Sequence, residues 1–201
     1  VVVCLNLVDT IMVGKVSENA LAAVGAANQV YFIYSVVIFG IFSGASVYAV
    51  QYWGLRDLSS LRKILGIDYL MCILVTIPTV IGAWFMAPQL IRLFAEETEV
   101  IQLGADYIRI ACFSYIFSSM SFVISFNSRC IQDLKIPTTI NAIAIGINII
   151  LNYGLIYGKM GLPELGVEGA AYATLIARIL ECGAMYTAVY MRKEHPLKAK
   201  L

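Results

Sequence analysis

The residues of this chain that could carry chemistry are an acid, three amides and a hydroxyl, all embedded in apolar sequence. Asp9 lies inside the first apolar run, where a carboxylate at membrane depth is costly unless it has a partner, a cavity or a proton. Asn141, Asn148 and Asn152 stand at positions i, i+7 and i+11, which places their side chains on one face of a helix. A further hydroxyl lies at a comparable predicted depth. Such an oxygen-rich pocket suits H+ or Na+ and no other metal, and the predicted cation-coupling residues are Asp9, Asn148, Asn152 and Thr174.

These polar residues also have a purely structural interpretation. The asparagines could serve only as interhelical hydrogen-bond partners, and Asp9 could be a carboxylate at a helix end that reaches the membrane surface. Two charged pairs at i, i+3 spacing, Asp106 with Arg109 and Arg178 with Glu181, predict mutual neutralisation rather than transport. The last apolar run opens with small residues that predict a close helix contact, namely Gly166, Gly169, Ala170 and Ala173.

The composition excludes most soluble classes of protein. Of the 201 residues, 60% are apolar and 13% are charged, with a mean hydropathy of +0.82, whereas soluble domains carry about a quarter charged residues. The formal net charge of +1 gives no basic field that could hold a nucleic acid. The five cysteines are scattered without a CxxC pair, the single histidine is His195, and no phosphate-binding loop is present. The sequence therefore predicts a protein that is not an enzyme and needs no cofactor beyond a coupling ion.

The apolar runs predict an all-α, polytopic transmembrane helix bundle of six spans. The first run is too short to cross the bilayer, because thirteen residues at about 1.5 Å each give roughly 20 Å against a hydrocarbon core of about 30 Å. We interpret it as the second half of a helix whose start precedes this chain. A short interfacial piece over 20–25 and a surface link over 89–102 are also predicted. The predicted spans are 1–13, 27–52, 64–87, 103–126, 138–157 and 169–191.

Loop charges predict the orientation of the bundle. The links over 54–63 and 127–137 and the tail over 192–201 hold nine lysines and arginines, whereas the remaining links hold three. By the positive-inside rule, the first set faces the cytoplasm. We therefore expect a multi-pass protein of the cell membrane with both ends of this six-span unit on the cytoplasmic side.

Six short sequence stretches follow one another along nearly the whole chain. They are VDTIMVG at 8–14, LAAVG at 21–25, QYWG at 51–54, QDLKIP at 132–137, NIILN at 148–152 and GVEGAAYAT at 166–174. In this order they resemble the N-terminal lobe of the MATE family, the multidrug and toxic compound extrusion transporters. The resemblance implies that 1–201 is the first six-helix lobe of a twelve-helix, two-lobe transporter, whose second lobe is absent from this chain.

The resemblance also implies a function and a site. Family members export cationic, lipophilic drugs or toxic compounds in exchange for H+ or Na+ by secondary active transport with alternating access. Asp9 matches the aspartate of the family's first helix, Asn148 the asparagine of its fifth, and Thr174 the threonine of its sixth. One turn after that asparagine some members carry an aspartate, whereas this chain carries Asn152, which favours proton over sodium coupling. The implied partners are small cationic or lipophilic substrates, the lipid bilayer and the second lobe, and no nucleic acid.

Two other functions stay open from the sequence. One is a flippase for lipid-linked precursors from the wider superfamily, which should have a more cationic central cavity than the span cations Arg109 and Arg178 provide. The other is a membrane scaffold subunit that transports nothing and uses its buried polar residues to hold helices together. Protonation separates the scaffold from the transporter, because a scaffold needs no carboxyl whose charge changes the shape of the bundle.

Overall fold

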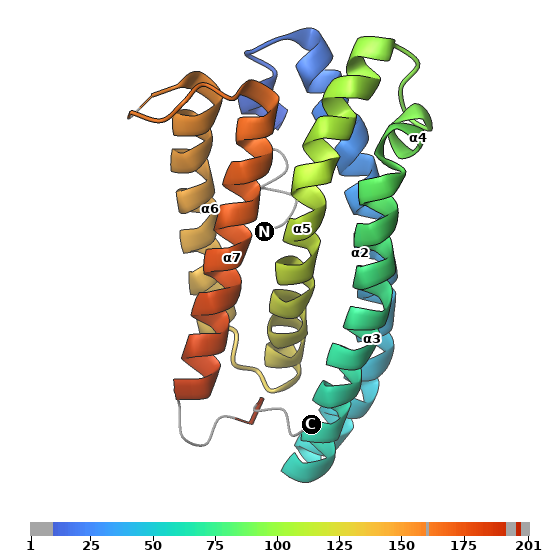
Figure 1. The fold of residues 1–201 in the computed structure, drawn as a ribbon. Coiled ribbons are helices and arrows are strands. Elements are labelled where there is room, and N and C mark those ends of the chain that lie inside the picture. The colour runs from blue at the N-terminus through green and yellow to red at the C-terminus, as the bar shows by residue number, and fades with distance from the viewer. Residues whose placement is uncertain (1–9, 160, 192–195, 198–201) are drawn as a thin grey trace.

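The part of the chain that the computed structural model describes, residues 10–159, 161–191 and 196–197, contains helices and no strands (Figure 1). After a helical stretch at 10–13, five long helices and one short helix follow one another within these residues. This confirms the predicted all-α class. The bounds are α2 (Glu18–Gly54), α3 (Leu58–Phe85), α4 (Ala87–Arg92), α5 (Thr98–Cys130), α6 (Lys135–Tyr157) and α7 (Gly166–Met191).

Local hydrogen bonds set where several helices begin and end. The Ser17 hydroxyl accepts a backbone N–H of the first turn at 3.0 Å and starts α2. The Ser60 hydroxyl and the N–H groups of Ser60 and Ser59 donate to the Asp57 carboxylate, which starts α3, and these bonds hold the pKa of Asp57 below its ordinary value. Gly158, with φ of 62°, ends α6 in the left-handed conformation that glycine adopts without strain.

Two of the predicted boundaries are wrong. The interfacial piece over 20–25 and the span over 27–52 form one continuous helix, α2, because no residue between them breaks it. Its 37 residues at about 1.5 Å each give roughly 55 Å, so α2 is much longer than a hydrocarbon core of about 30 Å. The predicted surface link over 89–102 contains most of α4, a separate helix that Pro88 helps to begin, and the first turn of α5 from Thr98.

α5 is the central helix of the bundle. It packs against α2, α3, α4 and α7, while α6 packs mainly along α7 (Figure 1). Tyrosine rings fill the contact between α2 and α5, where the centroid of the Tyr115 ring lies 5.0 Å from that of Tyr31 and 5.1 Å from that of Tyr34. The Tyr34 hydroxyl also forms a hydrogen bond with Thr76 Oγ1 on α3 at 2.8 Å. This cluster ties α2, α3 and α5 into one unit, beside which α6 and α7 form a pair.

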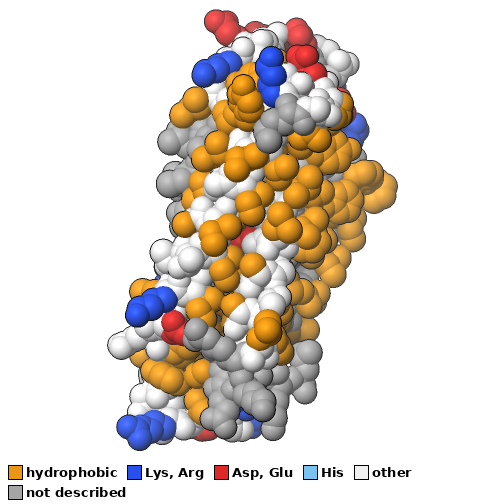
Figure 2. All heavy atoms as spheres, turned by 90° about the vertical axis from the view of Figure 1, so that its left-hand side faces the viewer, with side chains coloured by type: hydrophobic (Ala, Val, Ile, Leu, Met, Phe, Trp, Pro, Cys, Tyr) orange, Lys and Arg blue, Asp and Glu red, His pale blue; other side chains and the backbone are white. Residues whose placement is uncertain are grey.

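The outer surface of the long helices is apolar. Large hydrophobic side chains stay exposed, such as Phe32 at 61% and Phe85 at 75%, and Figure 2 shows apolar side chains along the middle of the molecule with charged ones mostly toward its two ends. By length and composition, α2, α3, α5 and α6 can each cross a membrane. α7 is a continuous helix of 26 residues, but the charged residues Arg178 and Glu181 interrupt its apolar sequence. The predicted polytopic helix bundle is confirmed, and the predicted span over 1–13 lies mostly outside the described residues.

Candidate functional site

Three of the four predicted site residues form a chain of hydrogen bonds between α6 and α7. Asn152 donates through Nδ2 to Asn148 Oδ1 at 3.1 Å, and Asn148 donates through Nδ2 to Thr174 Oγ1 at 3.3 Å. Both asparagines are fully buried, because their i, i+4 spacing turns them to the same inner face of α6. Thr174 is half-buried. We call these three residues the amide chain, and their role in cation binding stays a prediction.

A glycine allows the two helices of the amide chain to approach closely. A Cβ atom at Gly169 on α7 would overlap the Leu155 carbonyl oxygen on α6 and lie 2.7 Å from its carbonyl carbon, so only glycine fits there. Ala170 and Ala173 beside it are fully buried. The predicted close contact is thus confirmed at Gly169, whereas a Cβ atom at Gly166 would meet no atom within 4 Å. Thr174 follows just over one turn after Gly169, so this contact sets its distance from the α6 amides.

The other predicted residues lie away from the amide chain or outside the described part. Asp9 is outside the described residues, and its role as the coupling acid stays a prediction. Asn141, the third amide of the predicted stripe, lies two turns before the amide chain on α6 and lines a separate pocket. Within the described part of the chain, no group of three or more His, Cys, Asp or Glu side chains could hold a metal ion.

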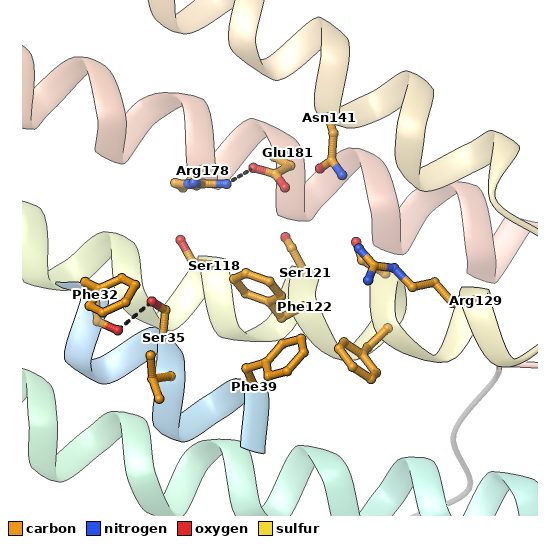
Figure 3. Close-up of a pocket in the computed structure, with 13 residues that line it drawn as sticks. Phe32, Ser35, Phe39, Ser118, Ser121, Phe122, Arg129, Asn141, Arg178 and Glu181 are labelled. Carbon is orange, nitrogen blue, oxygen red and sulfur yellow. Dashed lines mark hydrogen bonds and ion pairs between the residues drawn. The ribbon is translucent and has the colours of Figure 1, made fainter. Parts of the chain in front are cut away.

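That pocket has a volume of about 390 Å³ and lies between α2, α5, α6 and α7 (Figure 3). The volume is typical of a site for a small molecule. Figure 3 shows Arg178 and Glu181 on α7 facing Ser118 and Ser121 on α5 across the pocket. An apolar wall comes from four aromatic rings on α2 and α5, namely Phe32, Phe39, Phe122 and Phe126.

A buried ion pair forms one side of the pocket. Arg178 Nη1 donates to Glu181 Oε2 at 2.7 Å, and both side chains are only 4% exposed. The predicted neutralisation is confirmed for this pair and for Asp106 with Arg109, which are 3.0 Å apart but exposed. The Ser118 hydroxyl, opposite the buried pair, has no hydrogen-bond partner among the described residues. The pocket therefore offers a paired acid and base and an unused hydroxyl to a molecule that enters it.

A smaller cavity of about 20 Å³ shares lining residues with the pocket and with the amide chain. Ser118 and Arg178 line both the cavity and the pocket, and Thr174 lines the cavity while it also ends the amide chain. A cavity of this size has room for about one water molecule. Because the two sites share walls, a shift of α7 that changes the geometry of one also changes the other.

A stripe of serines on α5 is the feature that the sequence analysis missed. Ser118, Ser121 and Ser125 line the pocket, and Ser114 lines the small cavity. Their spacing of i, i+4, i+7 and i+11 places all four on one face of the helix. The same periodicity argument that was applied to the asparagines of α6 would have found them.

Comparison with protein families identifies the chain. The MatE family model matches residues 1–154, which is more than half of the sequence. The chain belongs to the MatE family. This confirms the resemblance seen in the six sequence stretches, and the MatE family is one of membrane transporters and not of enzymes.

Curated relatives of this MatE chain are named as drug-resistance proteins. The probable multidrug resistance protein NorM of Thermotoga maritima is 27% identical over 197 residues, which are 98% of this chain and 42% of the relative. The probable multidrug resistance protein YoeA of Bacillus subtilis is 32% identical, over 96% of this chain and 42% of its own length. A probable multidrug resistance protein NorM of Rhizobium meliloti is 34% identical, over 96% of this chain and 41% of its own length. This MatE chain thus spans less than half the length of the curated relatives that it matches.

Solved MATE transporters share the fold of this MatE chain. A multidrug resistance MATE family transporter of the MOP superfamily in its inward-facing conformation superposes with a TM-score of 0.90 at 22% identity, over 100% of this chain and 45% of that one. A structure of MATE in the bent conformation superposes with a TM-score of 0.88 at 22% identity, over 98% of this chain and 43% of that one. A share just under half is what one lobe of two provides, in agreement with the predicted N-terminal lobe.

Proposed function

We propose that this chain is the N-terminal lobe of a secondary active transporter that exports cationic, lipophilic compounds in exchange for protons by alternating access. A second six-helix lobe completes the substrate path, since the chain matches only 42% of the length of its relatives. The transporter lies in the cell membrane, with both ends of this lobe on the cytoplasmic side. Protons are proposed rather than Na+ because Asn152 brings no second carboxylate to the site.

The small cavity that borders both the pocket and the amide chain carries this proposal. Thr174 and Arg178 stand one turn apart on α7, where Thr174 accepts from Asn148 and Arg178 pairs with Glu181. Both also line the small cavity between the two sites. A movement of α7 that changes the contacts of the amide chain therefore alters the pocket directly, and coupling of this kind is what antiport requires.

The chemistry of the pocket supports cationic, lipophilic substrates. The phenylalanine rings offer apolar contact and faces that attract cations. Glu181 can exchange its bond with Arg178 for one with a substrate ammonium group, and Ser118 can bond a polar substituent of the same molecule. In this proposal the bound substrate takes the place of Arg178 as the partner of Glu181.

The proposed coupling acid is Asp9. This assignment depends on the position of Asp9 in the motif VDTIMVG, which resembles the family's first helix. It also depends on the presence of the other predicted site residues, Asn148, Asn152 and Thr174, in the same chain. A carboxyl that exchanges a proton changes the net charge of the lobe by one unit. Moving one charge through 100 mV is worth about 2.3 kcal/mol, which is enough to bias the rocking of one lobe against the other.

Membrane vesicles that contain the complete transporter test the proposal. Efflux of a fluorescent lipophilic cation is measured under a proton gradient and, separately, under a sodium gradient. We expect a proton gradient to drive export and Asp9→Asn to abolish it while insertion stays normal. The double variant Arg178→Gln with Glu181→Gln removes both charges of the pair without changing the net charge of the pocket, so the KM for the cation should rise about tenfold or more.

The matched control is Glu96→Gln, which makes the same chemical change at an exposed acid in the link before α5. Its export should equal that of the unmodified transporter. Undiminished export by Asp9→Asn would exclude the coupling role. An unchanged KM in the double variant would exclude the pocket as the substrate site.

Arg129 favours the flippase of lipid-linked precursors as the second candidate function. Its guanidinium carbon lies 5.5 Å from the centroid of the Phe126 ring at the pocket wall, and the other pocket cation, Arg178, is neutralised by Glu181. The pocket therefore carries net positive charge, which suits an anionic head group. Arg129→Gln separates the two functions, because a flippase would lose translocation of an anionic lipid, whereas export of a cation would persist or increase.

A further inference from the structure

A second buried acid lies on α3, away from the amide chain and the pocket. The Asp68 side chain is 2% exposed, and its Oδ2 accepts a hydrogen bond from Asn127 Nδ2 on α5 at 2.8 Å. Its other oxygen, Oδ1, has no hydrogen-bond partner among the described residues. No lysine or arginine of the described chain forms an ion pair with it. A carboxylate with a single hydrogen bond in such a place is strongly disfavoured relative to the neutral acid.

The groups around Asp68 suit a proton better than a metal ion. Asn127 also donates through Nδ2 to the Val123 carbonyl at 3.0 Å, which fixes the amide nitrogen, not the amide oxygen, toward Asp68. The titratable neighbours that interact with the carboxyl are the thiols of Cys72 on α3 and Cys130 on α5. An amide N–H and two thiols offer no ligand that Na+ prefers. Only the carboxyl itself can bind a hard cation there.

The helices packed around this acid add no compensating charge. Cys130 Sγ lies 4.0 Å from the Ser46 carbonyl oxygen of α2. At this contact α2 therefore contributes a neutral peptide group beside the thiol. α7 contributes Tyr186, whose ring packs on that of Tyr69 with centroids 6.2 Å apart. Among the described residues, no charged side chain forms an ion pair with Asp68, and the titratable groups that interact with it are the thiols of Cys72 and Cys130.

We propose that Asp68 and Asn127 form a second proton-binding site of this lobe. It lies toward the α2–α3 link and the last turn of α5, whereas the amide chain lies nearer the opposite ends of the helices. Binding a proton removes the buried charge, and releasing it leaves a carboxylate that must recruit water or separate α3 from α5. The site therefore links the packing of α3 on α5 to pH at the end of the lobe that carries most of its basic residues.

Infrared spectroscopy of the purified complete transporter tests this site without any transported compound. Difference spectra between acid and neutral pH report the C=O absorption of protonated carboxyl groups. We expect Asp68→Asn to remove one buried carboxyl signal and to lower proton uptake over the titration by about one proton per chain. Asp68→Glu should restore a signal. Glu96→Gln, the exposed control, should leave the buried carboxyl signal in place.

A second variant keeps the test informative when Asp68→Asn does not yield folded protein. Asn127→Leu keeps the acid and removes its donor, so the buried carboxyl signal should persist with a shifted frequency. Spectra that are identical with and without Asp68 overturn the proposal, and so does a signal from Asp68 that stays constant over the whole pH range. Undiminished drug export in Asp9→Asn would exclude the coupling role and leave the Asp68 signal untouched, so the two ideas fail separately.

Discussion

The close contact between α6 and α7 at Gly169 gives a quantitative test of what holds the amide chain together. In Gly169→Ala the added methyl carbon would lie 2.7 Å from the Leu155 carbonyl carbon and 3.1 Å from the Ile156 nitrogen. Ordinary contact begins at 3.4 Å, so the helices must separate by at least about 0.7 Å at this point, and the overlap with the Leu155 carbonyl oxygen requires more. The obstacle is backbone on α6, which cannot rotate out of the way as a side chain can.

This separation reaches the polar residues a short distance along both helices. The hydrogen bond from Asn148 to Thr174 is already 3.3 Å long and would lengthen to about 4 Å, beyond the range in which it contributes. Overpacking costs about 1–3 kcal/mol, and the lost hydrogen bond adds about 1 kcal/mol. The unfolding midpoint in detergent should therefore fall by several degrees.

Gly183→Ala is the matched control, because it places the same methyl group on an exposed face of α7 with no atom within 4 Å. Unfolding is followed by tryptophan fluorescence during heating, and proton-driven export is measured for both variants. We expect Gly183→Ala to match the unmodified protein in both assays and Gly169→Ala to lose stability and export together. Equal midpoints for the two variants would refute the argument that this backbone contact positions Thr174.

Three smaller perturbations test other parts of the lobe. Asn148→Leu takes one hydrogen bond from each neighbour in the amide chain, so the free energy of unfolding should fall by about 1–3 kcal/mol, seen as a lower unfolding midpoint. Tyr34→Phe loses the bond to Thr76 and should cost about 1 kcal/mol in the same assay, whereas Tyr48→Phe, exposed on the same helix, should cost nothing measurable. Hydrogen bonds lower the pKa of Asp57 below 3.8, so its stabilising effect is complete above that value and is lost as pH falls through the lowered pKa. Asp57→Asn should therefore flatten the acid side of the curve of stability against pH.

Local patterns in the sequence predicted the features that depend on one helix alone. The pairing of Arg178 with Glu181 follows from i, i+3 spacing, and the shared face of Asn148 and Asn152 follows from i, i+4 spacing. The start of α2 was misplaced for an equally local reason, because 20–25 was predicted as a separate interfacial piece although Ser17 caps a helix that continues through it. These successes and this error involve residues within one or two helical turns.

Features that depend on the register between helices could not be predicted in this way. Asp68 and Asn127 are 59 positions apart, and nothing in either helix indicates that the two side chains meet. The overlap that makes Gly169 irreplaceable likewise depends on which carbonyl of α6 faces it, here that of Leu155. The depth at which one helix packs on the next is a tertiary property, so only the structure supplies it.

The polarity of α7 explains why the candidate sites gather along it. Thr174, Arg178 and Glu181 stand at i, i+4 and i+7, so one face of the helix carries a hydroxyl, a base and an acid. That face makes α7 less apolar than α2, α3 and α6, and its charges are tolerated in a membrane because they pair with each other against the serines of α5. The position of α7 thus depends on polar contacts with α5 and α6. A helix whose placement depends on such contacts, rather than on its own apolarity, is the element best able to shift between two arrangements.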